Sequence, residues 1–416
     1  MHRDIVCGLD ICASNVRTLI ARSERVSTGK IKDRGIGLLS AKENVLGFAE
    51  SPTKGFSKSV VSNLGSLSDS IEASILKAED MAKARVRKVI TNVSGVHIRT
   101  FQSRGSVHIS DRPSEIRRED IKRCIESAKL IAMSLDREAI HLVPVRFFID
   151  DKMEINDPLG LFGSKLDVDL NIITSLVTVL QNITKAVNLA GYEVDDMVVS
   201  GAGTGLAIFS KEEMDNGAVL IDAGKEITEL SLFLDGRLLD CFNFPFGGDD
   251  LTQILQDSLK IMFDEAEDLK VKYGVVTKDI SRIDDSEIRY KGGVITRSRI
   301  SNLLLPKVEA VMEEIHKRLE PFLKNRKNLP VIRVAGNAAR MDGFIETIED
   351  IFKVPVNMGR IEDTDRLKDM NFAASLGLMR YGMKKLIAAK NLNIQEPAGL
   401  AKGIVAKIKS IVSEYF

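Results

Sequence analysis

The chain contains no tryptophan, few other aromatic residues and only four cysteines among its 416 residues. The cysteines are widely spaced, so they form none of the paired spacings typical of metal sites, and they fit a reducing compartment. No run of apolar residues reaches the length of about 18 that a membrane-spanning helix needs, and the apolar stretch after Asp4 is too short for a signal peptide. We therefore expect a soluble protein that is not secreted.

The chain also lacks an excess of charge of either sign, since 59 Lys and Arg residues balance 59 Asp and Glu residues. A basic surface would have indicated a nucleic-acid partner, and this balance removes that argument. The apolar fraction of 44% is ordinary for a globular protein. The length exceeds what one hydrophobic core supports and predicts about two to four subdomains.

A strongly amphipathic segment occupies residues 400–416, LAKGIVAKIKSIVSEYF. On a helical wheel at about 100° per residue, its large apolar side chains fall on one continuous side. The other side carries three lysines against one glutamate, the pattern of a helix that lies in an anionic membrane surface. The apolar residues are Leu400, Ile404, Val405, Ile408, Ile411, Val412, Tyr415 and Phe416, and the lysines are Lys402, Lys407 and Lys409.

The alternative for this segment is a terminal helix docked on its own domain. Residues 390–399, which precede it, are mostly polar and contain the run Glu-Pro-Ala-Gly. This composition is typical of a linker rather than of a tight turn between packed helices. It favours the membrane interpretation.

Two segments about half a chain apart have the same pattern. Residues 5–10 form a short apolar strand that ends in Asp10, followed by a tight turn and a second strand at 16–22. Residues 219–222 end in Asp222 in the same way and continue, after a turn, as a strand at 228–234. The repeat predicts a duplicated α/β architecture with related halves that face one cleft.

Between the two repeats the pattern changes over about 80 residues, which predicts a small inserted α+β subdomain. A helix with apolar residues at helical spacing precedes it, and alternating strands and helices resume after it. Gly191 is well placed to end a helix. The predicted segments are a helix at 66–84, strands at 88–94, 96–109 and 140–149, a helix at 114–133, a strand at 168–174, a helix at 175–190 and a strand at 194–199. In the second half we expect helices at 247–263, 265–273 and 301–323 and a strand at 331–335.

A nucleotide phosphate needs backbone amides that approach closely, and its Mg²⁺ needs acids that hold the water shell. Asp10 and Asp222 end their strands at such turns, and Gly247-Gly248 opens a helix whose N-terminal dipole suits an anion. A third turn, Gly336-Asn337-Ala338, follows a strand and could let a nucleoside pack on the backbone. Each turn alone is weak evidence, but their order along the chain is specific.

These turns, together with the C-terminal segment, resemble the FtsA family of bacterial cell-division proteins, membrane-tethered members of the actin superfamily. The similarity runs from about Asp4 to Phe416. It is densest in VSGVHIRTFQSRGSVHI, LQNITKAVNLAGYEV, FGGDDLT and EAEDLKVKYG. The inserted subdomain at this point in the chain sets the family apart from actin, MreB and the heat-shock chaperones.

The resemblance implies an α/β, actin-like fold with ribonuclease H-like duplicated halves, an inserted α+β subdomain and a C-terminal amphipathic helix. The first half comprises residues 1–84 and 166–200, with a return at 361–389, and the second comprises 201–240 and 301–360. The remaining segments are the insertion at 85–165, a subdomain at 241–300, the linker at 390–399 and the membrane helix at 400–416.

The resemblance also implies function. The family polymerises on the cytoplasmic face of the inner membrane at the division site and holds filaments of the tubulin-like protein FtsZ there. Residues 241–300 and the start of the next helix correspond to the subdomain that receives the FtsZ C-terminal peptide, and Lys307 and Glu309 lie in that helix. An ordinary solvated helix face explains these two residues about as well. The insertion is associated with self-interaction and with late division proteins.

By the same resemblance, ATP and Mg²⁺ would lie between the halves, with Asp10 and Asp222 arranging the water shell of the metal. The residues that flank the phosphates are Cys12, Ala13, Ser14, Asn15, Gly224, Lys225, Gly247, Gly248 and Asp249. Those that flank the nucleoside are Glu267, Lys270, Gly336, Asn337, Ala338 and Met341.

The sequence departs from the family at these loops. Relatives usually read Asp-Ile-Gly-Thr-Ser-Lys in the first loop, where this chain has a cysteine, an alanine and an asparagine in place of the glycine, the threonine and the lysine. The second loop has lost two glycines to Lys225 and Glu226, and the usual Glu-Pro pair is replaced by Ser200-Gly201. A carboxylate beside a triphosphate costs several kcal/mol unless it is screened, on the order of what micromolar affinity requires. We therefore expect weak nucleotide binding, little hydrolysis and no identifiable catalytic residue.

Two alternatives stay open. One is an active phosphotransferase or ATPase of the same superfamily, which would need a base that the sequence does not supply at Ser200. The other is an adaptor of the PilM type, which is actin-like and docks on a short peptide of a pilus-assembly partner. A lysine-edged helix behind a linker has no evident role in that second class.

Overall fold

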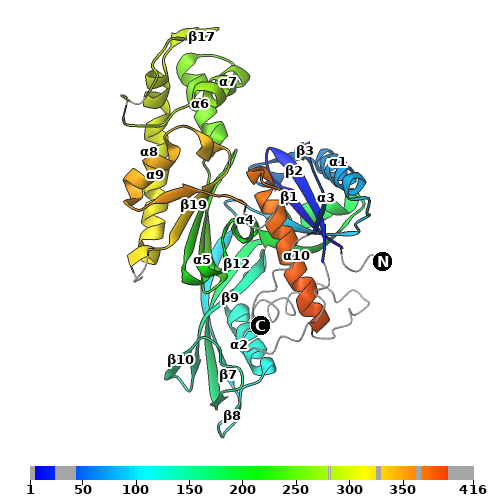
Figure 1. The fold of residues 1–416 in the computed structure, drawn as a ribbon. Helices are drawn as coiled ribbons and strands as arrows, with labels where there is room; N and C mark the ends of the chain where they lie inside the picture. Colours follow the sequence, from blue (N-terminus) through cyan, green and yellow to red (C-terminus); the bar gives the residue numbers. More distant parts are fainter. Residues whose placement is uncertain are drawn as a thin grey trace.

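The computed structural model describes residues 5–23, 44–279, 281, 283–324, 329–361 and 367–391. Two five-stranded sheets dominate it (Figure 1). In the first, β1 (Ile5–Ile11) and β2 (Asn15–Arg22) pair antiparallel around the first loop, and β3 (Asn44–Pro52) continues the antiparallel edge. On the other side of β1 the strands β6 (Lys88–Val93) and β13 (Glu193–Val199) run parallel to it.

The second sheet repeats this arrangement strand for strand. Its central strand β14 (Ala218–Ala223) pairs antiparallel with β15 (Thr228–Leu234), which pairs with β16 (Arg237–Phe244). On the other side of β14, β19 (Val331–Ala335) and β20 (Val356–Met358) are parallel. The shared topology confirms the duplicated halves that the two repeats in the sequence predict.

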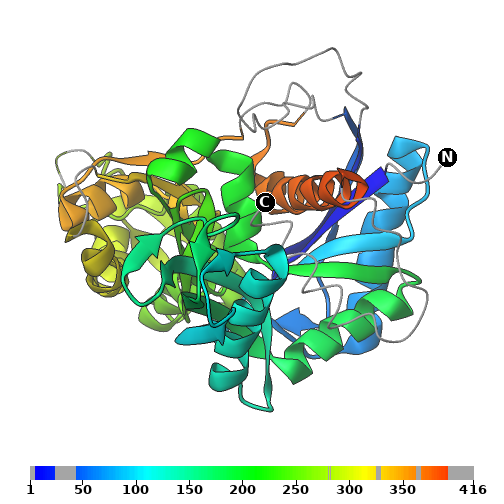
Figure 2. The same cartoon turned by 90° about the horizontal axis from the view of Figure 1, so that it is seen from below.

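Helices cover both faces of the first sheet (Figure 2). The helices α1 (Leu64–Ala82) and α3 (Val177–Leu189) lie on one face, and α10 (Ala373–Asn391) crosses the other and also packs on α4 (Ser200–Ile208). The approach of α10 is close, because a Cβ atom on Gly8 would lie 2.1 Å from the carbonyl oxygen of Ser375. A two-stranded hairpin, β4 (Phe56–Ser57) and β5 (Val60–Val61), connects β3 to α1.

The second half has its own hydrophobic core, built on the second sheet and the helices around it. The long helix α8 (Arg297–Lys324) buries one side along its length, from Ile300 to Leu319. The remaining elements of this half are α5 (Lys211–Asn216), α6 (Gly248–Leu259), α7 (Phe263–Tyr273), β17 (Ile288–Tyr290), β18 (Gly293–Ile295), the 3-10 turn η2 (Ala338–Arg340) and α9 (Phe344–Phe352). A further turn, η3 (Met370–Phe372), leads into α10.

The insertion extends away from both halves (Figure 1) and has a separate core. Its four-stranded antiparallel sheet has the order β10-β9-β12-β7, and α2 packs on it. The elements are β7 (Arg99–His108), β8 (Ser114–Glu115), α2 (Arg118–Ala132), β9 (Arg137–Ile149), β10 (Met153–Ile155), β11 (Phe162–Gly163) and β12 (Lys165–Leu176). Within the described residues, no helix is long and apolar enough to cross a bilayer.

Three predicted helix boundaries were wrong. Ser114 and Glu115 pair with β11 as a short strand, and the helix begins only at Arg118. The helix from Gly248 stops at Leu259 rather than 263, because Lys260 takes the left-handed conformation at φ 55°. The long helix α8 begins at Arg297, four residues before the predicted start. The predicted membrane helix at 400–416 and most of the linker lie outside the described residues.

Candidate nucleotide cleft

The two strand-ending aspartates lie close enough to interact where the two halves meet, and the region around them is called the cleft below. Asp10 is buried and accepts a hydrogen bond of 2.7 Å from the Asn92 side-chain amide at the end of β6. The Arg17 guanidinium lies 3.7 Å from the same carboxylate. Burial raises the pKa of Asp10 to about 6, although the charge of Arg17 and the hydrogen bond from Asn92 lower it.

Asp222 interacts electrostatically with Asp10 across the cleft. Its pKa is also raised to about 6, first by burial and then by the charge of Asp10. The hydroxyl of Thr204 on α4 lies 3.5 Å from its carboxylate. The charge of Asp10 thus disfavours ionisation of Asp222, and a divalent cation bound beside both carboxylates would relieve this repulsion. The described residues contain no group of three side chains placed to hold a metal, so such a cation would keep most of its waters.

A third acid, Glu229, is buried beside this pair. Its carboxylate accepts hydrogen bonds from Ser94 at 2.8 Å and from Ser231 at 3.2 Å. Burial, with a contribution from the charge of Asp222, raises its pKa to about 7. Because Ser94 directly follows β6 of the first sheet and Glu229 lies on β15 of the second, this bond joins the two halves across the cleft. Asn243 on β16 adds to the junction, since its side-chain oxygen lies 3.3 Å from the Ser94 hydroxyl and from the Gly95 amide.

The first loop, residues 11–15, closes on itself. The thiol of Cys12 donates to the Asn15 carbonyl at 3.1 Å, and the Cys12 amide donates to the same oxygen at 3.4 Å. Arg17 points back at the loop, with one guanidinium nitrogen 3.3 Å from the Cys12 sulfur. The cysteine therefore occupies a folded turn in which the family glycine would leave the backbone more freedom.

The second loop and the start of α6 are joined through their backbones. The amides of Gly248 and Asp249 donate to the carbonyls of Gly224 and Lys225, at 3.0 and 2.8 Å. A Cβ atom on Gly247 would lie 2.4 Å from the Lys225 carbonyl oxygen, so only glycine permits this approach. The first amides of α6, which the sequence suggests for an anion, thus have partners within the protein.

Glu226 of the second loop reaches the opposite half. Its carboxylate accepts a hydrogen bond from the Ser57 hydroxyl at 2.8 Å and another from the Lys58 amide at 2.5 Å. Lys58 and Ser59 form the tight turn of the β4–β5 hairpin, both at positive φ. The neighbouring Lys225 lies 3.9 Å from Asp249. The substitution of a family glycine by Glu226 has therefore created a contact that spans the cleft.

On the nucleoside side, Glu267 and Lys270 of α7 pair with each other at 2.6 Å. Lys270 also donates to the Gly248 carbonyl at 2.8 Å and lies 2.7 Å from the Thr252 hydroxyl. Gly336 has φ 88°, and a Cβ atom there would lie 2.1 Å from the Ala223 carbonyl oxygen. The turn after β19 therefore packs directly on the second loop, with Asn337 and Ala338 continuing it and Met341 near Gly274.

The structure thus brings the candidate residues of the two phosphate loops, α6, α7 and the β19 turn to the same cleft. It also adds three residues that sequence reasoning missed, namely Arg17, Asn92 and Glu229. Asn92 connects Asp10 with the start of α4, because its side-chain amide also donates to the Ser200 hydroxyl at 2.7 Å. A polar residue inside an otherwise apolar strand, as in KVITNV, was the available signal for it.

The two predicted partner-binding residues lie on α8 but have different environments. Lys307 is exposed, with its ammonium 5.9 Å from the centre of the Phe246 ring. Glu309 is partly buried and pairs with Lys278 at 2.6 Å. The predicted membrane residues lie beyond the described part of the chain.

Comparison with known proteins agrees with this architecture. A model described as "SHS2 domain inserted in FTSA" matches residues 95–174, and one described as "Cell division protein FtsA" matches 219–377. Together they span more than half of the chain. The chain belongs to the FtsA family. Its relatives include FtsA of Neisseria meningitidis, 28% identical over 98% of both chains, and FtsA of Borreliella burgdorferi, 28% identical over the whole of both. FtsA of Bacillus subtilis is 26% identical over 95% of this chain and 86% of its own.

Solved structures support the actin-like fold. The PilM–PilN type IV pilus biogenesis complex contains a chain with a TM-score of 0.62 and 17% identity, covering 91% of this chain and 98% of its own. MreB5 of Spiroplasma citri, bound to ADP, has a TM-score of 0.51 and 14% identity, covering 94% of this chain and 99% of its own. These likenesses concern the fold. The family models and the curated relatives identify the chain as an actin-like cell-division protein of the FtsA family.

Proposed function

We propose that the protein is a membrane-tethering adaptor of bacterial cell division, which assembles on the inner membrane and anchors FtsZ filaments there. Membership of the FtsA family gives the cell-division role, and the amphipathic pattern of residues 400–416 carries the membrane part. Half-burial of its bulky side chains in an interface is worth roughly 5–10 kcal/mol before losses. Ordering the helix and confining it to a surface removes much of this free energy. A single copy of residues 400–416, called the tail below, should therefore bind weakly and reversibly.

Sedimentation with vesicles of acidic lipid tests the tether directly. A chain that ends at Ala398 should stay in the supernatant, and so should Ile408→Glu, because a carboxylate on the apolar side cannot enter the lipid. Ser410→Glu introduces the same charge on the polar side and is the matched control, which should still pellet. If the truncated chain pellets as well as the full chain, the tail is not the anchor.

We further infer that the ATP site is degenerate and binds nucleotide weakly. Asp10 and Asp222 fit a role in arranging the waters of Mg²⁺, which would supply charge neutralisation to bound phosphates. The surrounding loops fit a triphosphate less well, because the first amides of α6 donate to protein carbonyls and Glu226 adds a carboxylate. Ser200 replaces the acid of relatives and lies within hydrogen-bond distance of Asn92, so nothing there supports efficient hydrolysis. Equilibrium binding of ATP with and without Mg²⁺ tests this.

The FtsZ C-terminal peptide is the proposed partner of the subdomain at 241–300 and the start of α8. Lys307 is exposed there and available to an acidic peptide. Lys307→Glu should weaken binding of that peptide to the full chain, and Lys317→Glu, further along the same helix, is the control. Absence of any binding by the unmodified chain would favour the PilM-type alternative.

A further inference from the structure

One direct contact between the two halves is made by Glu226 of the second loop. Its carboxylate accepts a hydrogen bond from the Ser57 hydroxyl at 2.8 Å and one from the Lys58 amide at 2.5 Å. Ser57 and Lys58 are exposed and Glu226 is half-buried, so this contact, called the rim contact below, lies toward the solvent. Because an ionised carboxylate accepts both bonds, each is stronger than a hydrogen bond between neutral groups.

Both partners of the rim contact are held in fixed turns. Lys58 and Ser59 have φ of 48° and 62°, the left-handed conformations of the tight β4–β5 turn. On the other half, the Gly224 amide donates to the Ile227 carbonyl at 2.9 Å and closes the loop that carries Glu226. Donors and an acceptor that are already oriented lose little conformational entropy when they meet, which favours the contact.

Deeper contacts join the same parts of the two halves. The Gly95 amide donates to the Asn243 side-chain oxygen at 3.3 Å, and the Ser94 hydroxyl donates to Glu229 at 2.8 Å. Gly95 packs against the β4–β5 turn, because a Cβ atom on Gly95 would lie 2.6 Å from the Cβ atom of Ser59. The turn of the rim contact therefore touches the backbone that meets Asn243, and these inner contacts form one continuous junction with the rim contact.

We propose that the rim contact is a built-in latch, in which the Glu226 carboxylate keeps the two halves in the observed arrangement without a bound nucleotide. In proteins whose ligand binds between two domains, the ligand commonly supplies the contacts that hold the domains closed. Here the chain itself supplies such contacts, since the acceptor lies on one half and both donors lie on the other. The inference rests on the proposed degenerate ATP site and extends it, because a cleft that its own side chains close reaches this arrangement without nucleotide.

Hydrogen exchange of the nucleotide-free full chain tests the latch. The amides of Lys58 and Gly95 are the reporters, because Glu226 accepts the first and Asn243 accepts the second. Both amides should exchange at least about a hundredfold more slowly than in the unfolded chain. Glu226→Ala should accelerate exchange at Gly95 by about tenfold, since loss of a charge-assisted contact between the halves favours their opening by such a factor.

Two further variants distinguish a latch from a local contact. Glu226→Gln keeps one acceptor oxygen, so its exchange at Gly95 should fall between that of the unmodified chain and that of Glu226→Ala. Ser57→Ala removes a donor from the opposite half and should also accelerate exchange at Gly95. Its effect should add less than fully to that of Glu226→Ala, because both substitutions break the same contact. Glu287→Ala, at an exposed position, is the control and should exchange like the unmodified chain.

Faster exchange at Lys58 with unchanged exchange at Gly95 in Glu226→Ala would overturn the latch, because Glu226 would then bind the hairpin without holding the halves together. Exchange of both amides at the unfolded rate in the unmodified chain would overturn it as well. No nucleotide is present in these experiments, so their result does not depend on the affinity for ATP. Tight ATP binding would refute the degenerate site and leave the latch in place.

Discussion

Three acidic residues at the cleft are buried, although burial disfavours their charged forms. Asp10, Asp222 and Glu229 are close enough to influence one another, and all three have raised pKa values. Arg17 is the nearest compensating cation, but it also contacts Glu50 at 3.0 Å and the first loop. The folded state therefore holds these acids at a cost that grows as they ionise.

Glu229→Gln tests this cost. The pKa of Glu229 is about 7 in the folded state against an ordinary 4.5, so the folded state binds the extra proton between these values and loses it as the pH rises. The free energy of unfolding therefore falls as the pH rises from about 4.5 to about 7, because the unfolded state releases this proton first, and the total loss is on the order of 3 kcal/mol.

The glutamine cannot ionise, so the variant should gain stability relative to the parent between pH 5 and pH 8. Denaturant unfolding at both pH values measures the difference. Glu287→Gln, at an exposed position, should show no such change. A difference between variant and parent that is independent of pH would mean that Glu229 is not buried in the ionised form.

A second residue whose charge can be tested is Glu226. Glu226→Gly restores the family residue, removes a carboxylate from the second loop and breaks the contacts with Ser57 and Lys58. Removal of one like charge near the phosphates should strengthen Mg²⁺-ATP binding by about tenfold, equivalent to about 1.4 kcal/mol. Fluorescence titration with a labelled ATP analogue measures it, and Glu287→Gly serves as the control. Equal or weaker binding in the variant would show that the cross-cleft contact, rather than the charge, decides affinity.

At the scale of elements, the strands of the two repeats could be predicted closely from the sequence. The strand predicted at 228–234 is β15, and the one at 331–335 is β19, because short segments rich in apolar residues and bounded by turn residues leave few alternatives. Boundaries that depend on tertiary contacts could not be predicted from the sequence. The short strand β8 exists only because β11, some fifty residues further on, pairs with it.

The residues of the candidate site fall into the same two groups, those that the sequence predicts and those that only the structure reveals. Asp10, Asp222 and the glycines of the turns are visible in the sequence because they stand where strands end. Arg17, Asn92 and Glu229 lie within strands, and only the folding of the sheets brings them to the cleft. The contact of Glu226 with the opposite half also depends on the β4–β5 hairpin, which the sequence does not connect with that loop.

The packing of α2 on its sheet depends on a glycine in β7. A Cβ atom on Gly105 would lie 2.3 Å from the Cys124 carbonyl and 2.6 Å from the Ala128 amide, so Gly105→Ala must push the helix away. We expect a loss of about 2–3 kcal/mol in the stability of the insertion. Hydrogen exchange of the α2 amides measures it locally. Gly65→Ala in α1 has room, with its nearest contact at 3.7 Å, and should be neutral or slightly stabilising. Equal protection of α2 in Gly105→Ala and in the parent would contradict this close packing.

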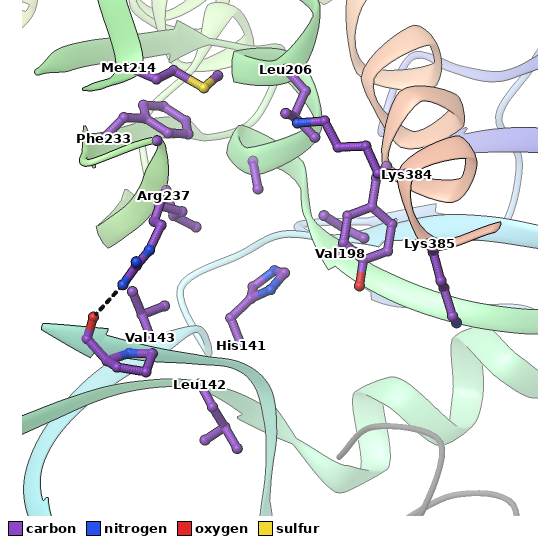
Figure 3. A pocket seen from close by; sticks show the side chains of 15 residues that line it. His141, Leu142, Val143, Val198, Leu206, Met214, Phe233, Arg237, Lys384 and Lys385 are labelled. Atoms are coloured by element: carbon purple, nitrogen blue, oxygen red, sulfur yellow. Dashed lines mark hydrogen bonds between the residues drawn. The ribbon is translucent and has the colours of Figure 1, made fainter. Parts of the chain in front are cut away.

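At the scale of the whole molecule, helix α10 is the element that connects the two halves and precedes the C-terminal segment. Helix α10 lies on β1 of the first half, packs on α4, and lines a pocket together with β9 of the insertion (Figure 3). The approach of the two helices is tight, since a Cβ atom on Gly377 would lie within 1.6 Å of the Gly203 carbonyl oxygen. The C-terminal segment therefore follows a helix that packs on the first sheet and on α4.

This arrangement predicts cooperative attachment to membranes. Under the proposed function a single tail binds weakly, but a filament would present many tails, and each bound tail would raise the effective concentration of the next. The fraction of protein that sediments with acidic vesicles should therefore rise more steeply than a hyperbola as protein concentration increases. The three lysines each contribute about 1 kcal/mol near an anionic surface, so replacing Lys402, Lys407 and Lys409 by glutamine should lower affinity on the order of a hundredfold. Vesicles of neutral lipid should reproduce that loss with the unmodified chain. A hyperbolic isotherm of high affinity would mean that each tail anchors its own subunit and that assembly adds nothing to attachment.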